Sequence, residues 1–269
     1  MANNSVASAL GDHGTEVPKT LHLRDITKTY GGRTVVDIPD LVLGSHGIEG
    51  LIGPNGAGKT TLMKLITHGV RADSGHVMYY TNNSEIELSE SRVEEIARLG
   101  IVKTNQVIQD FESLTIKDSL LLALASSQQE RFYNFFSEKK LRAQTEEEID
   151  GYLEYFRFED PDGRALSAGE KKLLDIVRCL VLKPKFLLMD EPTAGLPEDQ
   201  TRKVMELMAR KTVEEDMTIL IVEHDLDLIW EVCEFVHFMA EGQILVQGPP
   251  EEIRSNSTLA EKYLGTSHV

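Results

Sequence analysis

The sequence lacks the long apolar and basic segments that define several classes of protein. No window in the 269 residues approaches the ~20 consecutive apolar residues needed to cross a bilayer. The opening segment, Met1 to Ser5, has neither the basic nor the apolar region of a signal peptide. The formal net charge of −16 is opposite in sign to that of most nucleic-acid-binding surfaces. We therefore expect a cytosolic protein that does not bind nucleic acid.

Cysteine is scarce, and internal repeats are absent. Cys179 and Cys233 lie far apart, without C-x-x-C spacing, and each has apolar neighbours. This pattern predicts small buried thiols rather than metal ligands or a disulfide. Residues 1–20 are small and polar and predict a disordered lead-in. The remainder, residues 21–265, is long enough for one large domain.

The clearest feature that is present is a glycine-rich loop with the spacing G-x-x-x-x-G-K-T. It lies between an apolar run, Ile48 to Ile52, and a helix-like segment, Leu62 to Ile66. Glycines let backbone N–H groups point at phosphate oxygens, and the following helix adds its N-terminal partial charge. The motif predicts triphosphate binding, with Lys59 on the β- and γ-phosphates and the Thr60 hydroxyl on Mg²⁺. The predicted loop comprises Gly53, Pro54, Asn55, Gly56, Ala57, Gly58, Lys59, Thr60 and Thr61.

Patterns elsewhere predict an α/β fold with a mainly parallel sheet, an antiparallel side sheet and an inserted helical subdomain. Apolar runs at Phe186 to Met189 and Thr218 to Val222 are typical of strands buried on both faces. Residues 105–180 have little strand pattern and predict the helical subdomain, with Thr115 as a helix cap. The other expected strands are Leu21 to Ile26, Thr34 to Ile38, Leu41 to Leu43, Ser74 to Tyr80, Ile101 to Gln106, Val236 to Met239 and Gln243 to Val246. The other expected helices are Ser89 to Leu99, Ser167 to Leu182, Thr201 to Thr212 and, after a break at Gly248-Pro249-Pro250, Leu259 to Leu264.

Two carboxylates and a histidine follow the predicted buried strands. Asp190 ends the first run, where a strand delivers a carboxylate to Mg²⁺, commonly through water. Glu191 comes next and is the candidate general base that orients and deprotonates an attacking water. His224 follows the second run, at the strand edge where α/β sheets bind ligands. From the residues alone, a γ-phosphate contact and a structural role are equally expected for His224.

The segment Leu166-Ser167-Ala168-Gly169-Glu170 completes a set of motifs in a known order. The set is Tyr30, Gly53 to Thr61, Gln106, Leu166 to Glu170, Asp190-Glu191 and His224. With these motifs the chain resembles the ATP-binding-cassette (ABC) ATPases over roughly residues 21–265. The resemblance implies a P-loop NTPase core, ATP and Mg²⁺ as cofactors, and hydrolysis of ATP to ADP and phosphate.

The resemblance also assigns roles to site residues. Tyr30 is implied to stack on adenine, and His224 to hold the γ-phosphate. Gln106 is implied to contact Mg²⁺ or the attacking water and to sense a membrane partner. The signature residues assigned to nucleotide contact are Ser167, Ala168, Gly169 and Glu170. They are implied to reach the γ-phosphate bound to an opposing subunit, so two chains would sandwich two ATP molecules.

Three further segments, less specific than the core motifs, are similar to segments in the ATPase subunits of branched-chain amino acid and urea importers. They are Gly100 to Gln106, Asp190 to Leu196 and Lys262 to Gly265. Subunits that drive lipopolysaccharide export have similar segments, so import and export both stay open. The resemblance implies a separate membrane permease, an indirect solute-binding protein, and a peripheral position on the inner face of the cell membrane. We expect the permease to dock near Gln106.

The chain departs from the family pattern at the signature and after the paired carboxylates. Ala168 and Glu170 stand in L-S-A-G-E where the family usually has L-S-G-G-Q, and Pro197 replaces a usual aspartate. Ala168 would be strained only if its φ were positive. These departures would fit a heterodimer with unequal ATP sites, and a homodimer also stays open. The rival interpretation is a soluble cassette ATPase, such as an iron–sulfur assembly scaffold, whose signature continues like Gly169 to Lys172.

Overall fold

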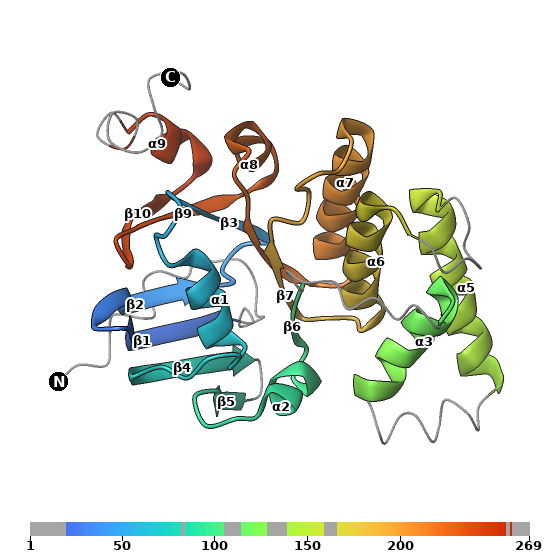
Figure 1. Ribbon diagram of the computed structural model, residues 1–269, viewed down its shortest axis with the longest axis horizontal. Coiled ribbons are helices and arrows are strands. Elements are labelled where there is room, and N and C mark those ends of the chain that lie inside the picture. Colours follow the sequence, from blue (N-terminus) through green and yellow to red (C-terminus); the bar gives the residue numbers. More distant parts are fainter. Residues whose placement is uncertain are drawn as a thin grey trace.

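Two sheets, packed against helices, organise the described part of the chain (Figure 1). The computed structural model describes residues 20–81, 84–104, 114–127, 139–158, 166–256 and 259. The larger sheet contains, in spatial order, β10 (Gln243–Gly248), β9 (Phe235–Ala240), β3 (Ile48–Ile52), β8 (Thr218–Val222), β7 (Phe186–Asp190) and β6 (Ile101–Lys103). The smaller contains β2 (Arg33–Leu43), β1 (Thr20–Tyr30), β4 (Ser74–Thr81) and β5 (Ser84–Glu87). All pairs in the larger sheet are parallel except β9 with β10, and all pairs in the smaller are antiparallel. The predicted fold class is confirmed.

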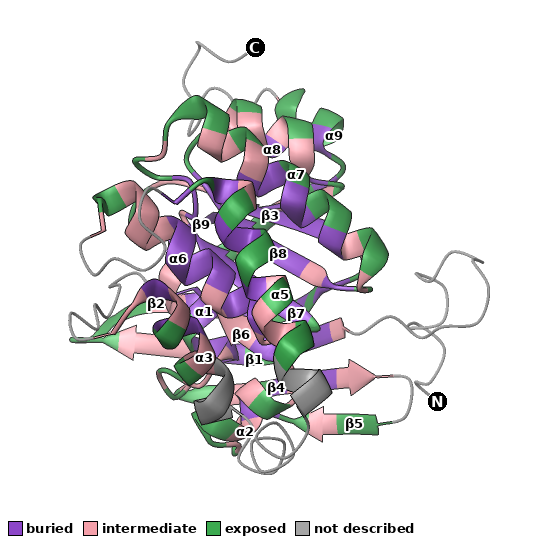
Figure 2. Cartoon of the chain, turned by 90° about the vertical axis from the view of Figure 1, so that its right-hand side faces the viewer, coloured by how far each residue is buried: buried purple, intermediate pink, exposed green. Residues whose placement is uncertain are grey.

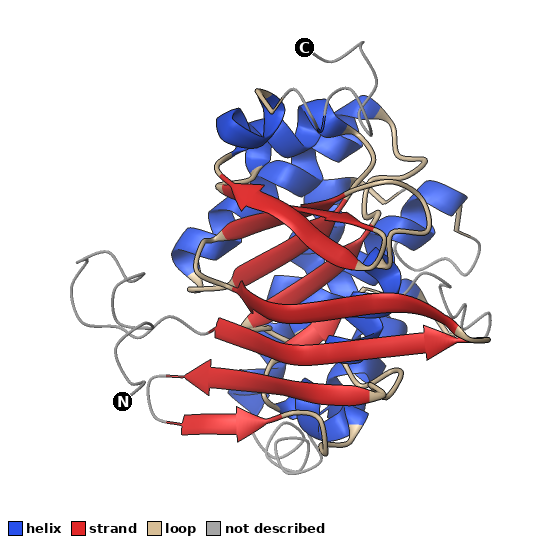
Figure 3. Cartoon of the chain, turned by 90° about the vertical axis from the view of Figure 1, so that its left-hand side faces the viewer, coloured by secondary structure: helices blue, strands red, loops and turns tan. Residues whose placement is uncertain are grey.

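Both faces of the larger sheet are buried, as the continuous apolar runs predict. On β7, Leu187 and Met189 pack in one core, and Leu188 packs in the other. Viewed from the side of the smaller sheet, the strands lie in front of most helices (Figure 3). Buried residues gather on the central strands, and exposed residues lie on the outer turns of the helices (Figure 2). The helices are α1 (Lys59–Ile66), α2 (Val93–Arg98), α3 (Ile116–Ser127), α5 (Lys139–Phe156), α6 (Ala168–Val181), α7 (Glu198–Glu214), α8 (Leu226–Val232) and α9 (Pro250–Arg254).

Side-chain caps are present at two helix starts, and of these Thr115 is the one predicted as a cap. The Ser167 hydroxyl accepts a hydrogen bond from the Glu170 N–H at 3.2 Å, at the start of α6. The Thr115 hydroxyl accepts one from the Asp118 N–H at 3.0 Å, before α3. Each cap satisfies an N–H group that the helix cannot pair internally.

None of the described helices has the length and apolarity required to cross a bilayer.

The predicted strands before the phosphate loop were wrong in their limits. β1 continues past Ile26 to Tyr30. The prediction stopped at Ile26 because a bulge, with Asp25 at φ 52°, interrupts the alternation of apolar and polar residues. β2 is one strand rather than two, and it includes Pro39. Proline is tolerated there because β2 is the edge strand of its sheet and needs no hydrogen bond on its outer side.

Two helix limits also differ from the prediction. α2 begins at Val93 rather than near Ser89, and the N–H of Arg92, at the N-cap position, donates to the Glu95 carboxylate at 2.8 Å. The Gly-Pro-Pro segment was predicted only as a break, but it starts α9, with Pro249 as cap and Pro250 in the first turn. Proline suits that position because the first N–H groups of a helix lack internal partners. Of the expected last helix, only Leu259 lies within the described residues.

Candidate active site

The phosphate loop is held tightly against β2 and β9. Gly53 has φ 146°, and a Cβ added there would lie 1.9 Å from the carbonyl oxygen of Met239. Gly58 has φ 110°, and its Cβ would lie 2.4 Å from the carbonyl oxygen of Val35. The Ala57 carbonyl accepts a hydrogen bond of 3.0 Å from the Gly242 N–H. The glycines therefore serve two needs, a backbone that L side chains rarely adopt and close contact with neighbouring strands.

Lys59 points back across the loop that precedes it. Its Nζ donates to the carbonyl of Gly53 at 2.6 Å and to that of Pro54 at 3.1 Å. Burial lowers the pKa of Lys59, an effect that the nearby carboxylates of Glu191 and Asp190 oppose. Neutral backbone carbonyls thus hold the ammonium group over the loop, where it could contact the phosphate oxygens of a bound nucleotide.

The N-terminus of α1 has no side-chain cap. Gly58 is the cap residue, in a left-handed conformation, and no described side chain accepts from the first N–H groups. Uncapped N–H groups and the helix dipole form an anion-binding site when a phosphate is present. The local sequence therefore leaves this helix end open where the nucleotide is predicted to bind.

Asp190 lies at the carboxyl end of β7 with a half-satisfied carboxylate. The residue is 1% exposed, its Oδ2 lies 3.3 Å from Lys103 Nζ, and Oδ1 is buried with no hydrogen-bond partner in the described part of the chain. A buried unpaired oxygen is costly unless something outside the chain binds it. Thr60, whose side chain lines the same site as Glu191, supplies a hydroxyl from α1. Carboxylate and hydroxyl oxygens are ligands that Mg²⁺ prefers, so these residues fit the ion.

Glu191 and His224 meet at the ends of two neighbouring strands. His224 Nε2 lies 3.0 Å from Glu191 Oε1. Glu191 has φ 50°, and its N–H donates to the Val222 carbonyl at 2.8 Å, which fastens this strained residue to β8. Non-glycine residues in that conformation are uncommon and collect at functional sites. Tertiary structure, rather than local preference, holds the Glu191 carboxylate at this edge.

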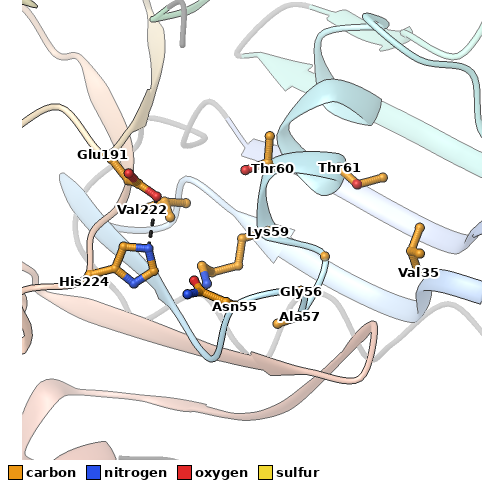
Figure 4. Close-up of a pocket in the computed structure, with 11 residues that line it drawn as sticks. Val35, Asn55, Gly56, Ala57, Lys59, Thr60, Thr61, Glu191, Val222 and His224 are labelled. Carbon is orange, nitrogen blue, oxygen red and sulfur yellow. Dashed lines mark hydrogen bonds and ion pairs between the residues drawn. The ribbon is translucent and has the colours of Figure 1, made fainter. Parts of the chain in front are cut away.

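Part of the predicted set lines one cavity of about 240 Å³, whereas Asp190, Gly53 and Pro54 are not among its lining residues. Asn55, Lys59, Glu191 and His224 point toward a common space between the phosphate loop and the strand ends (Figure 4). The full lining is Val35, Asn55, Gly56, Ala57, Gly58, Lys59, Thr60, Thr61, Glu191, Val222 and His224. Among the described residues there is no cluster of three or more histidine, cysteine, aspartate or glutamate side chains that could hold a metal ion.

Other predicted residues lie away from this lining. Tyr30 is 47% exposed at the end of β1, with Lys28 Nζ 5.4 Å from its ring centre. Val35, on the next strand, is the apolar side chain from this region that lines the cavity. Gln106 lies outside the described residues. The adenine contact of Tyr30 and both roles of Gln106 stay predictions.

The signature residues also lie outside the cavity lining. Ser167 caps α6, and both its N–H and its hydroxyl contact the Glu170 carboxylate, at 2.9 and 2.8 Å. Ala168 begins α6 without a positive φ, so the strain considered for it does not arise. Pro197 caps α7 with φ −60°. A Cβ added to Gly169 would meet only Leu196, at 3.6 Å, so nothing within the described chain requires glycine at that position.

Sequence reasoning missed the groups that support the site. The buried Glu223 carboxylate accepts from the Thr193 N–H at 2.8 Å and from its hydroxyl at 2.6 Å, which anchors the segment after Glu191. The Thr104 hydroxyl accepts from the Asp190 N–H at 3.1 Å. In the sequence, these supporting groups are marked only by being polar residues next to the end of a buried strand.

Cys179 and Cys233 are free and buried, as predicted, and burial raises the pKa of Cys233 to about 12.

Comparisons with known proteins agree with this geometry. The family model described as ABC transporter matches residues 39–194, more than half of the chain. The branched-chain amino acid transport ATP-binding protein LivG of Salmonella typhimurium is 32% identical, over 91% of this chain and 97% of that protein, and that of Escherichia coli K12 is 31% identical over the same shares. A crystal structure of the ADP conformation of an ATP-binding cassette of an ABC transporter has a TM-score of 0.74 and 27% identity, over 91% of this chain and 98% of that one. The chain therefore belongs to the ABC transporter family and is one of its cassette ATPases.

Proposed function

We propose that the chain binds Mg²⁺·ATP in the cavity beside the phosphate loop and hydrolyses it to power transport by a separate membrane permease. The observation that carries this proposal is the convergence of Lys59, Glu191 and His224 on one space lined by the loop. The three side chains come from α1 and from the ends of two buried strands, so their meeting is a property of the fold. Lys59 and the open N-terminus of α1 bind the phosphates.

Glu191 is the general base of this proposal. It orients a water molecule and accepts its proton as the water oxygen bonds to the γ-phosphorus and the bond to the bridging oxygen of ADP breaks. His224, 3.0 Å from that carboxylate, orients it and reaches the γ-phosphate. General base catalysis requires the carboxylate to lie within hydrogen-bond reach of the attacking water, and a contact with His224 helps to hold it in place.

Thr60 and Asp190 would hold Mg²⁺, which neutralises phosphate charge as the bond breaks. The buried Asp190 Oδ1 without a partner in the described ranges supports this assignment. Tyr30 stacks on the adenine from the end of β1, and Val35 of β2 adds an apolar side chain to the cavity. Gln106 contacts the ion or the attacking water and transmits the state of the site to the permease.

A second chain completes the site. Ser167 and Gly169 are not among the residues that line this chain's own cavity, and a Cβ on Gly169 would meet only Leu196, at 3.6 Å. We infer that they act on nucleotide bound to an opposing cassette, with Ala168 and Glu170 in the same helix end. ATP then closes the two chains, and hydrolysis reopens them.

The transported solute is a branched-chain amino acid or a similar small polar molecule. This assignment rests on the relatives named for branched-chain amino acid transport, of which the match covers 97%. The permease and solute-binding protein are separate chains, and the cassette lies on the cytoplasmic face of the membrane, attached through the permease.

The test is purification of the tagged full chain from membranes of its own cells, followed by identification of the chains that co-purify. We expect an integral membrane permease, ATP hydrolysis by the complex, and slower leucine uptake when the chain is depleted. Recovery only in soluble complexes, with no permease, would overturn the transport role and favour the soluble scaffold. Failure of the purified complex to hydrolyse ATP would overturn the assignment of Glu191.

A further inference from the structure

Lys103 reaches the carboxylate of Asp190 from the neighbouring strand. Its Nζ lies 3.3 Å from Oδ2, and the two side chains are 14% and 1% exposed. β6 and β7 pair in parallel, with Lys103 opposite Leu188, so a long side chain at the end of β6 extends to the carboxylate at the end of β7. Among the described residues, Asp190 is the only anionic side chain paired with Lys103.

The backbone around this pair has little freedom. The Thr104 N–H donates to the Leu188 carbonyl at 2.9 Å, and the Asp190 N–H donates to the Thr104 hydroxyl at 3.1 Å. Both strand ends are therefore fixed, and Lys103 is the side chain among the described residues that pairs with the Asp190 carboxylate. One oxygen faces Lys103, and the other has no described partner.

A buried carboxylate without a counter-ion is strongly destabilising. Lys103 supplies that counter-ion when no nucleotide is present. A magnesium ion held by the same carboxylate adds a second cation at close range, where burial makes charge interactions strong. Lys103 therefore stabilises the empty site and opposes the ion that the site is built to hold.

We propose that Lys103 is a positioning residue that occupies the Asp190 carboxylate in the nucleotide-free chain and raises the Mg²⁺ concentration needed for nucleotide binding. The inference rests on the proposed Mg²⁺·ATP function and deepens it. It makes Lys103 a determinant of the metal requirement, acting through Asp190 rather than on the nucleotide itself.

The test compares the full-length wild type with Lys103→Met, which keeps the length of the side chain and removes its charge. ADP affinity is measured by titration calorimetry, first with EDTA and then over a series of free Mg²⁺ concentrations. We expect the half-saturating Mg²⁺ concentration to fall about 10-fold in Lys103→Met, because a cation beside the ion is gone. ADP affinity in EDTA should change less than about 2-fold, since the phosphate contacts are intact.

Two further variants serve as controls. Lys103→Arg keeps the charge and should keep the wild-type Mg²⁺ requirement. Lys185→Met removes an exposed charge just before β7, at the end of the strand opposite Asp190, and should also leave the requirement unchanged. If Lys103→Met does not fold, Lys103→Gln takes its place with the same expected direction.

An unchanged or increased Mg²⁺ requirement in the uncharged variant would overturn the inference, whether or not its melting temperature falls. The lysine would then have a structural role only. Failure of the wild type to bind ADP would instead overturn the proposed nucleotide-binding function. These outcomes separate the two proposals.

Discussion

The phosphate loop and the signature present two helix N-termini that differ in how their N–H groups are satisfied. α1 begins without a side-chain cap in the described structure, and its lysine is held by backbone carbonyls. α6 begins with a complete capping box, in which the Glu170 carboxylate contacts both the N–H and the hydroxyl of Ser167. The first end is open to phosphate, whereas the second already holds an internal carboxylate, which a phosphate would have to displace under the proposed function. The phosphate loop is therefore the preorganised half of the proposed site.

Glycines in the two loops differ in the same way. Gly58 has a positive φ, and its Cβ would contact neighbouring backbone, whereas Gly169 has neither constraint. Glycine is thus needed by the fold in the phosphate loop, whereas in the signature only the proposed contact with an opposing chain would require it. The comparison makes separate predictions for stability and for activity.

The largest expected effect concerns catalysis at the phosphate-loop half. Glu191→Gln keeps the size of the side chain but removes its basic oxygen. We expect turnover of ATP to fall by about 10²–10⁴-fold, the usual contribution of a general base, with ATP binding retained. Steady-state phosphate release and ATP titration of the purified complex measure the two quantities.

Glu214→Gln, at the end of α7, is the matched control for this substitution and should leave turnover unchanged. Equal turnover in Glu191→Gln and wild type would remove Glu191 from the mechanism. The phosphate-loop half would then bind nucleotide without supplying the base.

The second prediction separates the two glycines. Gly58→Ala should lower the free energy of unfolding by about 2–4 kcal/mol and abolish ADP binding, because its Cβ would lie 2.4 Å from the Val35 carbonyl oxygen. Gly169→Ala should leave the unfolding free energy within about 1 kcal/mol of wild type, since alanine favours a helix. It should nevertheless reduce ATP turnover by the assembled complex. Urea unfolding, ADP titration and turnover give the three readouts.

Loss of stability in Gly169→Ala comparable with that in Gly58→Ala would contradict the distinction. An undiminished turnover in Gly169→Ala would show that the signature glycine has no external contact. The first outcome tests the structural need for glycine at each position, and the second tests the proposed contact of Gly169 with an opposing chain.

The third prediction concerns the strand that carries the phosphate loop. Glu49, on β3, is buried and contacts His237 at 3.2 Å, His46 at 3.4 Å and the Gly44 N–H at 3.0 Å. Burial opposes its ionisation, but these contacts prevail and lower its pKa from 4.5 to about 2. Because the folded-state pKa is the lower one, the carboxylate stabilises the fold above pH 4.5, and this contribution is lost as the pH falls from 4.5 toward 2.

Glu49→Gln should therefore cost about 3 kcal/mol of unfolding free energy at neutral pH, and the difference from wild type should shrink below pH 4.5. Denaturant titrations at several pH values measure it. A difference that stays constant down to pH 2 would mean that the charge of Glu49 has no part in stability.

The smallest expected effect tests the capping carboxylate of the signature. Glu170→Gln keeps a side-chain oxygen that can accept from the Ser167 N–H, but it removes a negative charge from the helix end that must meet phosphate. We expect ATP-driven association of two chains to strengthen about 2–5-fold, since a charge near a helix end contributes roughly 0.3–1 kcal/mol. Analytical ultracentrifugation with ATP, in a Glu191→Gln background that blocks turnover, measures it. Weaker association would mean that Glu170 assists the contact instead of competing with it.

Features contained in a few neighbouring residues were predictable from the sequence. The glycine-rich loop before α1, the helix start at Ser167 and the apolar run of β7 were all located correctly. Each depends on local backbone geometry or on the alternation of side chains along one strand. The family resemblance relied on the same short motifs, and the family match confirms it.

Features that join distant parts of the chain were decided only by tertiary structure. The pair of Lys103 and Asp190 spans 87 positions, and Thr193 with Glu223 spans 30. The left-handed backbone of Glu191 depends likewise on a hydrogen bond to Val222 on another strand. The sequence by itself determined the elements and the chemical groups at their ends. Only the tertiary structure decided which groups share the buried edge, because strand order, and not sequence distance, brings charges within hydrogen-bond range.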